Sequence, residues 1–213
     1  MPGTRLPMFP LSAVLFPHGS MPLHVFEPRY RALMRDCLGG DRRFGVVLIE
    51  RGSEVGGGDQ RATVGTRGVI TRAAELVDGR WMLEVRGEAV VAVEEWLPDD
   101  PYPVALVSET APVPGGQDPA PLLDAVARRV RRARALLAEH GGGPPLPPGL
   151  ELDGGGDAEA ATWQLCAAAP LSAYDAQRLL AISDPVERVR LLDSLVEEVQ
   201  RDLERMLGAE EAE

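Results

Sequence analysis

The chain has 213 residues, enough for one large domain or two small ones, and its 45% hydrophobic and 26% charged residues are typical of globular proteins. Its net charge of −11 argues against a nucleic-acid-binding protein, because neutralising phosphates needs clustered cations. No apolar run is long enough to cross a bilayer and no signal peptide is recognisable, so we expect a cytoplasmic protein without a membrane partner. The sequence contains no lysine, which excludes a Ser–Lys dyad, a phosphate-loop lysine and a Schiff base formed by this chain.

The N-terminal stretch predicts two strands and a short helix. Residues 4–11 alternate loosely and contain two prolines, which favours an edge strand. Residues 23–27 predict a short strand, and Pro28 suits the first position of a helix that would end at Gly39–Gly40. The apolar residues of this helix recur at i, i+3, i+4 and i+7, and they are Tyr30, Leu33, Met34 and Cys37.

Further short strands follow up to residue 109. A Gly-rich loop at 52–60 is better explained as a hairpin loop than as a phosphate cradle, because no helix follows it. Asp78–Gly79 is a hairpin-turn signal. The predicted strands are 44–51, a long strand at 62–76 bent near its glycines, two strands within 81–96 that pivot at Gly87, and 102–109. Many short strands with one helix near the start predict a closed or half-closed β barrel over residues 1–113.

The second half, residues 114–213, has a helical period interrupted by a Gly/Pro-rich linker at 140–157 that we expect to be flexible. The first helix carries an apolar stripe of Leu122, Val126, Val130, Ala133 and Leu137. Short helices are predicted at 158–169 and 172–182, and a last helix has Asp184 as its N-cap. Its apolar 3–4 repeat (Val189, Leu192, Val196, Val199, Leu203 and Met206) favours an intramolecular helix bundle over a coiled-coil dimer.

Five arginines lie within residues 127–140. They are compatible with a basic face for nucleic acid or membrane, but Arg128, Arg131 and Arg132 lie opposite the apolar stripe. Since this half holds 10 arginines against 18 acidic residues, we interpret them as a solvated face that pairs with acidic residues of a neighbouring helix.

No constellation of catalytic or metal-binding residues stands out. The three histidines, His18, His24 and His140, lack the spacing of a metal site. His24 and Glu27 are three apart on a short strand and so would point to opposite faces, which argues against a serine hydrolase. Cys37 and Cys166 are expected to be buried, reduced thiols. We therefore predict no catalytic, cofactor-binding or metal-binding residues.

The opening stretch "LPMFPLSAVLFPHGSMPLHVFEPRYRALMRDCL" resembles the start of the Lon protease N-terminal domain family. That family opens with a Leu-Pro-x-Phe-Pro-Leu strand and continues with Pro-Leu-x-x-Phe-Glu-x-Arg-Tyr into a helix. The likeness continues through "FGVVLIE", "VGTRGVI" and "DGRWMLEVRGE", and in the helical half through "QRLLAISDPVERVRLLDSL". The motif residues in this chain are Phe9, Pro10, Leu11, Pro22, Leu23, Phe26, Glu27, Arg29 and Tyr30.

The resemblance implies an α+β fold, a PUA-like β pseudobarrel followed by a C-terminal α-helical bundle. In full Lon proteases this region engages unfolded protein substrates. The resemblance therefore implies a bacterial, stand-alone, non-enzymatic module without the ATPase and protease domains, which binds unfolded or extended protein segments as an adaptor or holdase. An ATP-dependent protease or a chaperone is a further candidate partner. Where the family often has Arg-Phe after the "VRGE" strand, this chain has Ala89–Val90.

The motif itself is interpreted mainly as scaffold. Its aromatic side chains, Phe9, Phe26 and Tyr30, together with Phe16, are expected to fill the core of a small barrel. A binding surface is expected in an apolar groove between barrel and helices. Two alternatives stay open, a small serine hydrolase and an RNA-binding accessory protein, the latter by fold analogy alone.

Overall fold

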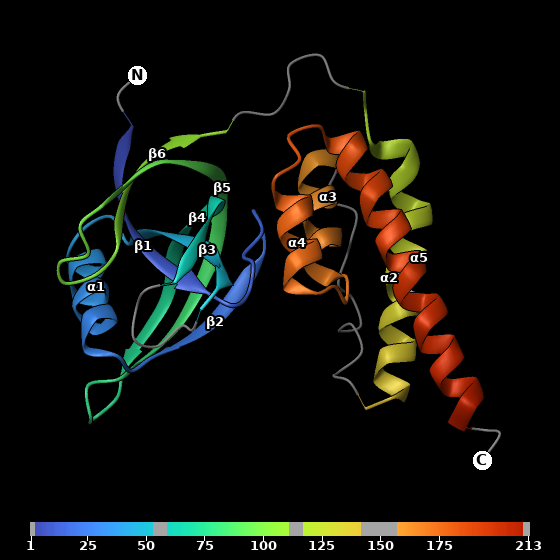
Figure 1. Cartoon of the computed structure of the whole chain (residues 1–213), viewed down its shortest axis with the longest axis horizontal. Coiled ribbons are helices and arrows are strands. Elements are labelled where there is room, and N and C mark those ends of the chain that lie inside the picture. Colours follow the sequence, from blue (N-terminus) through green and yellow to red (C-terminus); the bar gives the residue numbers. More distant parts are fainter. Residues whose placement is uncertain (1–2, 53–58, 111–116, 142–156, 211–213) are drawn as a thin grey trace. The chain divides into compact units, whose positions relative to one another are not determined.

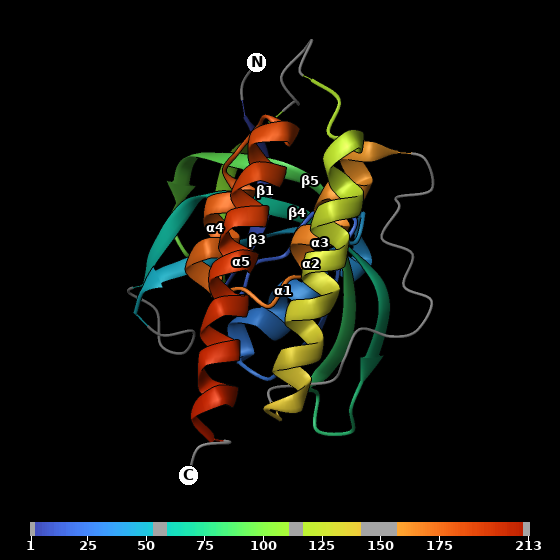
Figure 2. The ribbon, with the colours of Figure 1, turned by 90° about the vertical axis from the view of Figure 1, so that its right-hand side faces the viewer.

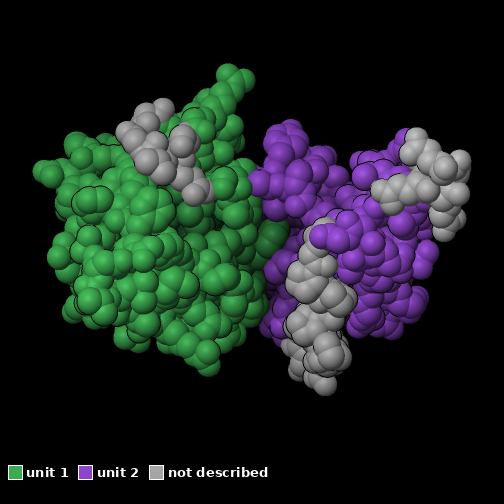
Figure 3. Space-filling model, turned by 90° about the horizontal axis from the view of Figure 1, so that it is seen from below, with its two compact units in different colours: residues 1–111 green, residues 112–213 purple. Residues whose placement is uncertain are grey.

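The structure of the protein is a computed structural model (Figure 1). It describes residues 3–52, 59–110, 117–141 and 157–210. The chain divides into two compact units, residues 1–111 and 112–213, which are coloured separately in Figure 3. The Gly-rich loop predicted at 52–60 and the linker predicted at 140–157 lie mostly outside the described residues.

The described part of the first unit holds six strands and one helix. In chain order they are β1 (Thr4–Leu11), β2 (Ser20–Val25), α1 (Pro28–Gly39), β3 (Arg43–Arg51), β4 (Gln60–Glu75), β5 (Trp81–Leu97) and β6 (Val104–Glu109). The strands form one sheet in the order β2-β5-β4-β3-β1-β6, and β6 pairs a second time with β5. That second pairing closes five strands into a barrel, as the strand pattern predicted, and leaves β2 beside β5 as the one strand with a single partner among the described strands.

β5 is one continuous strand of 17 residues, whereas the sequence predicted two strands that pivot at Gly87. Its first part, up to Arg86, pairs with β2, and its last part, from Val91, pairs with β6. A β-carbon at Gly87 would overlap the carbonyl oxygen of Phe16, and Gly87 N–H donates to the carbonyl of Gly19 (2.9 Å). The glycine therefore lets the segment before β2 cross β5 closely, and it does not end the strand.

β1 lies between β3 and β6, so the prediction of an edge strand over residues 4–11 is wrong. The first half of β1 pairs with β6 and its second half with β3. Met8 N–H donates to the Pro103 carbonyl on the β6 side (2.8 Å). Residues two apart face the same way, so the nitrogen of Pro10 faces that side too, beyond the last pair with β6. The nitrogen of Pro7 faces the β3 side, one residue before the first pair with that strand. Neither proline therefore removes a hydrogen bond from a ladder.

α1 closes the main core of the barrel. It begins with Pro28 at its first position and ends at Gly39 before the cap residue Gly40, as predicted. Burying each large apolar side chain contributes about 1.5–3 kcal/mol relative to exposure. The predicted stripe is buried and packs with strand residues in one cluster, whose aromatic members are Phe9, Tyr30 and Phe44 and whose α1 members also include Leu33, Met34 and Cys37.

The described part of the second unit holds four helices, α2 (Ala120–Glu139), α3 (Ala158–Ala168), α4 (Ala173–Leu180) and α5 (Pro185–Glu210). Figure 2 shows the two long helices α2 and α5 side by side, and α3 packs on both of them. The centre of the α2 stripe is buried as predicted, although Leu136 rather than Leu137 is buried near its end.

The apolar repeat of α5 packs within the unit up to Leu203, while Met206 is exposed. Its helix starts as predicted, because the carboxylate of Asp184 accepts hydrogen bonds from the backbone N–H groups of Val186 (2.8 Å) and Glu187 (3.0 Å). The arginine-rich face of α2 is partly paired with α5, as expected, through Arg129–Asp193 (2.7 Å) and Arg132–Glu204 (3.8 Å).

The turn between α4 and α5 is held by a buried arginine. Arg188 is 2% exposed, and its Nε (3.2 Å) and Nη2 (2.7 Å) both donate to the carbonyl oxygen of Ile182. Its guanidinium carbon lies 3.5 Å from the centroid of the Trp163 ring on α3. Arg188 therefore ties the turn, α3 and α5 together, and its burial lowers the pKa of the guanidinium.

The crossing at Gly87 predicts a position-specific effect of an added methyl group. We expect Gly87→Ala to lower the free energy of unfolding by about 1–3 kcal/mol, because the new side chain would displace the Phe16 carbonyl. The matched control is Gly39→Ala at the end of α1, where nothing lies within 4 Å of the added carbon. It should leave stability unchanged or raise it by up to about 1 kcal/mol. Urea unfolding followed by circular dichroism measures both, and equal stability of the two variants would contradict the crossing.

The contacts of Arg188 at the α4–α5 turn predict that a positive charge alone does not maintain the stability of the fold. Lysine at position 188 cannot donate twice to the Ile182 carbonyl or stack flat on Trp163, so we expect Arg188→Lys to cost about 1–3 kcal/mol of unfolding free energy. The control Arg190→Lys changes an exposed neighbour on the same helix and should stay within about 0.5 kcal/mol of the wild type. Tryptophan fluorescence in urea compares the two, and an equally small effect of both would refute this role.

Candidate functional site

Most of the motif residues meet around one small cavity of about 60 Å³. Its walls come from the second half of β1, from the end of β2 and from the start of α1. The lining residues are Phe9, Pro10, Leu11, Leu23, His24, Val25, Phe26, Glu27 and Tyr30. Two motif residues do not line it: Pro22 lies next to Leu23 on β2, and Arg29 lies next to Tyr30 on α1.

The inner wall of the cavity is a buried, stacked aromatic pair. Phe9 and Tyr30 are buried, and their rings stack with centroids 4.2 Å apart; Phe9 also lies 6.0 Å from Phe44. Burial raises the pKa of the Tyr30 hydroxyl to about 12. Its phenol is therefore neutral at physiological pH, and these residues serve the core as the sequence predicted.

Glu27, the charged residue of the cavity lining, forms an ion pair with Arg29. The Arg29 Nε lies 3.2 Å from the Glu27 carboxylate, and the Arg29 guanidinium lies 4.5 Å from the centroid of the Tyr30 ring. Glu27 occupies the N-cap position of α1, but its side chain caps no backbone N–H there. The carboxylate in the cavity lining is therefore paired with a cation.

The serine-hydrolase alternative would need His24 beside a serine and an orienting carboxylate, and the described residues do not provide this arrangement. His24 is exposed on β2, and the Glu27 carboxylate pairs with Arg29. Ser20 is four residues before His24 on the same strand, a separation of about 13 Å that does not permit direct proton transfer. Ser53 of the "GSEVG" stretch lies outside the described residues.

An exposed apolar row crosses the outer face of the sheet next to this cavity. Ala74 on β4 pairs with Met82 on β5, Met82 pairs with His24 on β2, and the rings of His24 and Phe26 lie 6.0 Å apart. We call Ala74, Met82, His24 and Phe26 the outer row. Phe26 is 51% exposed and Met82 is 46% exposed, so the assignment of Phe26 to the core is wrong, while Phe9, Phe16 and Tyr30 are buried as predicted.

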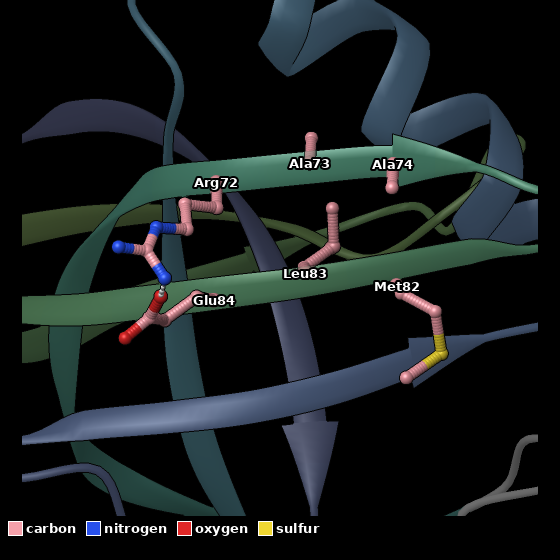
Figure 4. A pocket seen from close by; sticks show the side chains of 6 residues that line it. All are labelled: Arg72, Ala73, Ala74, Met82, Leu83 and Glu84. Atoms are coloured by element: carbon pink, nitrogen blue, oxygen red, sulfur yellow. Dashed lines mark ion pairs between the residues drawn. The ribbon is translucent and has the colours of Figure 1, made fainter.

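Figure 4 shows the part of this face formed by β4 and β5, with the side chain of Met82 extending toward the neighbouring strand. A shallow, open depression of about 530 Å³ lies there, bordered by Arg72, Ala73, Ala74, Met82, Leu83 and Glu84. Arg72 and Glu84 pair across the strands at 3.4 Å, which again leaves a surface without net charge. Sequence reasoning missed Met82, although strand alternation with buried Leu83 and Val85 places it on the outer face.

Other candidate chemistry finds no support in the described residues. Both cysteines are buried and unpaired, and burial raises the pKa of each thiol to about 12. Within the described ranges no three His, Cys, Asp or Glu side chains are grouped to hold a metal ion. None of the helices described combines the length and apolar character that a membrane crossing requires.

Two much longer proteins are similar in sequence to this chain. Lon protease 2 of Herpetosiphon aurantiacus is 28% identical over 194 residues, which are 88% of this chain and 23% of that protein. A LON peptidase N-terminal domain and RING finger protein of Schizosaccharomyces pombe is 28% identical over 110 residues, 46% of this chain and 22% of that protein. The chain spans less than a quarter of the length of these two relatives.

Solved structures confirm the predicted Lon N-terminal domain fold. A Lon N-terminal domain protein from Xanthomonas campestris has a TM-score of 0.64 and 30% identity, covering 89% of this chain and 96% of that one. The N-terminal domain of a Mycobacterium avium complex Lon protease has a TM-score of 0.60 and covers 91% and 98%; at 16% identity it supports the fold alone. The family profile for the ATP-dependent protease La (LON) substrate-binding domain matches residues 5–198. The chain therefore belongs to the Lon substrate-binding domain family.

Proposed function

We propose that the protein binds unfolded or extended segments of other proteins without catalysing a reaction, as an adaptor or a holdase. The observation that carries this proposal is the outer row, where Phe26 directly after β2 and Met82 on β5 are about half exposed. Membership of a substrate-binding domain family supports the same function. An exposed apolar group of this kind gains free energy only when a partner covers it.

The chemistry of the outer row fits unfolded proteins better than a single small ligand. The depression is open and shallow, so it offers area without the enclosure that small-molecule sites have. Burying the exposed halves of Phe26 and Met82 would contribute about 1–2 kcal/mol each. Weak, additive apolar contacts of this size suit many different clients, and methionine adapts to their shapes.

Several finer points belong to this proposal. We propose a PUA-like classification for the barrel, a bundle classification for the helices, and a cytoplasmic location. An ATP-dependent protease or a chaperone is proposed as the downstream partner, since Lon proteases are among the relatives. The motif residues are proposed to be mainly structural, with Phe26 as the exception, and a groove between the two units stays a prediction. The hydrolase and RNA-binding alternatives gain no specific observation from the described residues.

The outer row predicts that its two large side chains carry client binding. We expect Phe26→Ser combined with Met82→Ser to weaken binding of reduced, carboxymethylated α-lactalbumin at least about tenfold, because both apolar contacts are lost. Fluorescence anisotropy of the labelled client measures the affinity.

The control for this experiment is Tyr174→Ser, which removes an aromatic side chain that is 72% exposed on α4. It should bind the client like the wild type. Unchanged binding by the double variant, or an equal loss in the control, would contradict the assignment of the outer row.

A non-enzymatic protein with buried thiols should also be inert toward thiol reagents. Because the pKa of both thiols is raised to about 12, the thiolate fraction at pH 8 is about one in ten thousand and the sulfurs are shielded. We expect no reaction with Ellman's reagent at pH 8 in the folded protein, and two thiols per chain to react in 6 M guanidinium chloride. Rapid labelling of one thiol in the folded state would point instead to an accessible nucleophile.

A further inference from the structure

We propose that the client segment binds as an added β-strand on the outward edge of β2, and that one of its side chains enters the cavity beside Phe26. This inference rests on the proposed function and specifies its binding mode. It is carried by the direction of the backbone groups of β2, by two prolines that face the same opening, and by the size and charge of the cavity.

The hydrogen-bond pattern of β5 fixes which groups of β2 point outward. Leu76 N–H donates to the Arg80 carbonyl (2.8 Å), so even-numbered residues of β5 up to Arg86 bond toward β4. Odd-numbered residues therefore bond toward β2, and the hydrogen bond from Gly87 N–H to the Gly19 carbonyl agrees with this alternation. Gly19 and the odd-numbered residues of β2 use their backbone groups on β5.

The backbone groups of Ser20, Pro22 and His24 therefore point away from β5. All three residues are exposed, and among the described strands β2 pairs with β5 alone. Proline is tolerated in a strand where its nitrogen faces away from the partner, which is the situation of Pro22. The edge thus offers the N–H of Ser20 and His24 and the carbonyls of all three residues.

A second strand borders the same opening. The nitrogen of Pro10 on β1 faces away from β3 and lies beyond the last pair with β6, and the cavity is lined by Phe9–Leu11 of β1 together with residues 23–27. Pro10 and Pro22 both lack an N–H toward this opening, so the two edges cannot form a regular ladder with each other. The outward edge of β2 is therefore left without a ladder to β1.

These features select an extended polypeptide as the occupant. Only a peptide backbone supplies donors and acceptors that alternate along both sides at the spacing of a strand. The charges near the opening are paired as Glu27–Arg29, so an uncharged side chain is complementary to the cavity. Its volume of about 60 Å³ is far below the roughly 300–1,000 Å³ of pockets that hold drug-sized ligands. A small apolar side chain such as valine or alanine fits this space better than an aromatic ring.

The test compares two substitutions at one position. His24→Pro removes the outward N–H without touching the bonds to β5, whereas His24→Ala removes the imidazole and keeps the N–H. The probe is a fluorescein-labelled nine-residue peptide, Gly-Ser-Val-Thr-Ala-Thr-Val-Ser-Gly, with affinity measured by anisotropy on the full chain. We expect His24→Pro to bind the peptide about tenfold more weakly than His24→Ala, because both variants lack the imidazole and only the proline lacks the outward N–H.

A second measurement keeps the wild-type protein and changes the peptide, so it does not depend on the folding of a variant. Two methylated peptides are compared, one N-methylated at odd-numbered and one at even-numbered residues. One of them should lose binding and the other should keep it, because only alternate N–H groups of an added strand face β2. The edge-strand inference is overturned if both methylated peptides bind like the unmethylated one and His24→Pro binds like His24→Ala.

The failures of the two proposals differ. A wild-type protein that binds neither carboxymethylated α-lactalbumin nor the peptide overturns the proposed function and this inference together. A wild-type protein that binds α-lactalbumin, while the peptide result is negative, overturns only the strand addition. A chain that dimerises through β2, with a dimer that His24→Pro dissociates and that the peptide does not displace, assigns the edge to a second copy and likewise overturns it.

Discussion

The close crossing of the segment before β2 over β5 at Gly87 is the contact on which the barrel depends. β5 is long enough to serve two neighbours, and the glycine is the point where it passes from β2 to β6. Because β6 closes only one end of the barrel, the other end keeps β2 as a strand with one partner among the described strands. The free edge, the cavity and the outer row all lie at that open end, so the site follows from the way the barrel closes.

Scaffold and site share one short sequence motif. Phe9 and Tyr30 stack inside the barrel, and α1 is held there by its buried stripe. The same stretch places His24 and Phe26 on the outside, directly before and directly after buried Val25. A strand necessarily presents alternate residues to opposite faces, so a motif that builds the core also builds a surface beside it.

The paired charges fit the proposed binding of varied apolar clients. Glu27 is paired with Arg29 and Glu84 with Arg72, so neither the cavity nor the depression presents an isolated charge to a client. Exposed ion pairs contribute little to stability. For the proposed clients, they would leave apolar contact and backbone hydrogen bonding as the main sources of affinity, and neither depends on one client sequence.

Local chemistry made much of the structure predictable. Pro28 and Asp184 mark helix starts, Asp78–Gly79 marks a hairpin, and the apolar spacing of α1, α2 and α5 identified their buried faces; each signal depends on residues within one or two turns. The motif residues could be named from the sequence, and the structure shows that most of them surround one cavity.

Pairing partners and exposure were decided only in three dimensions. The sequence could not show that β1 has a different neighbour along each half, because prolines that face away from a partner look the same as prolines on an edge. Nor could it show that β5 runs unbroken past Gly87, or that Phe26 lies outside and Met82 beside it. Those facts depend on contacts between residues far apart in the chain, and local residue preferences do not encode which distant segment arrives to cover a side chain.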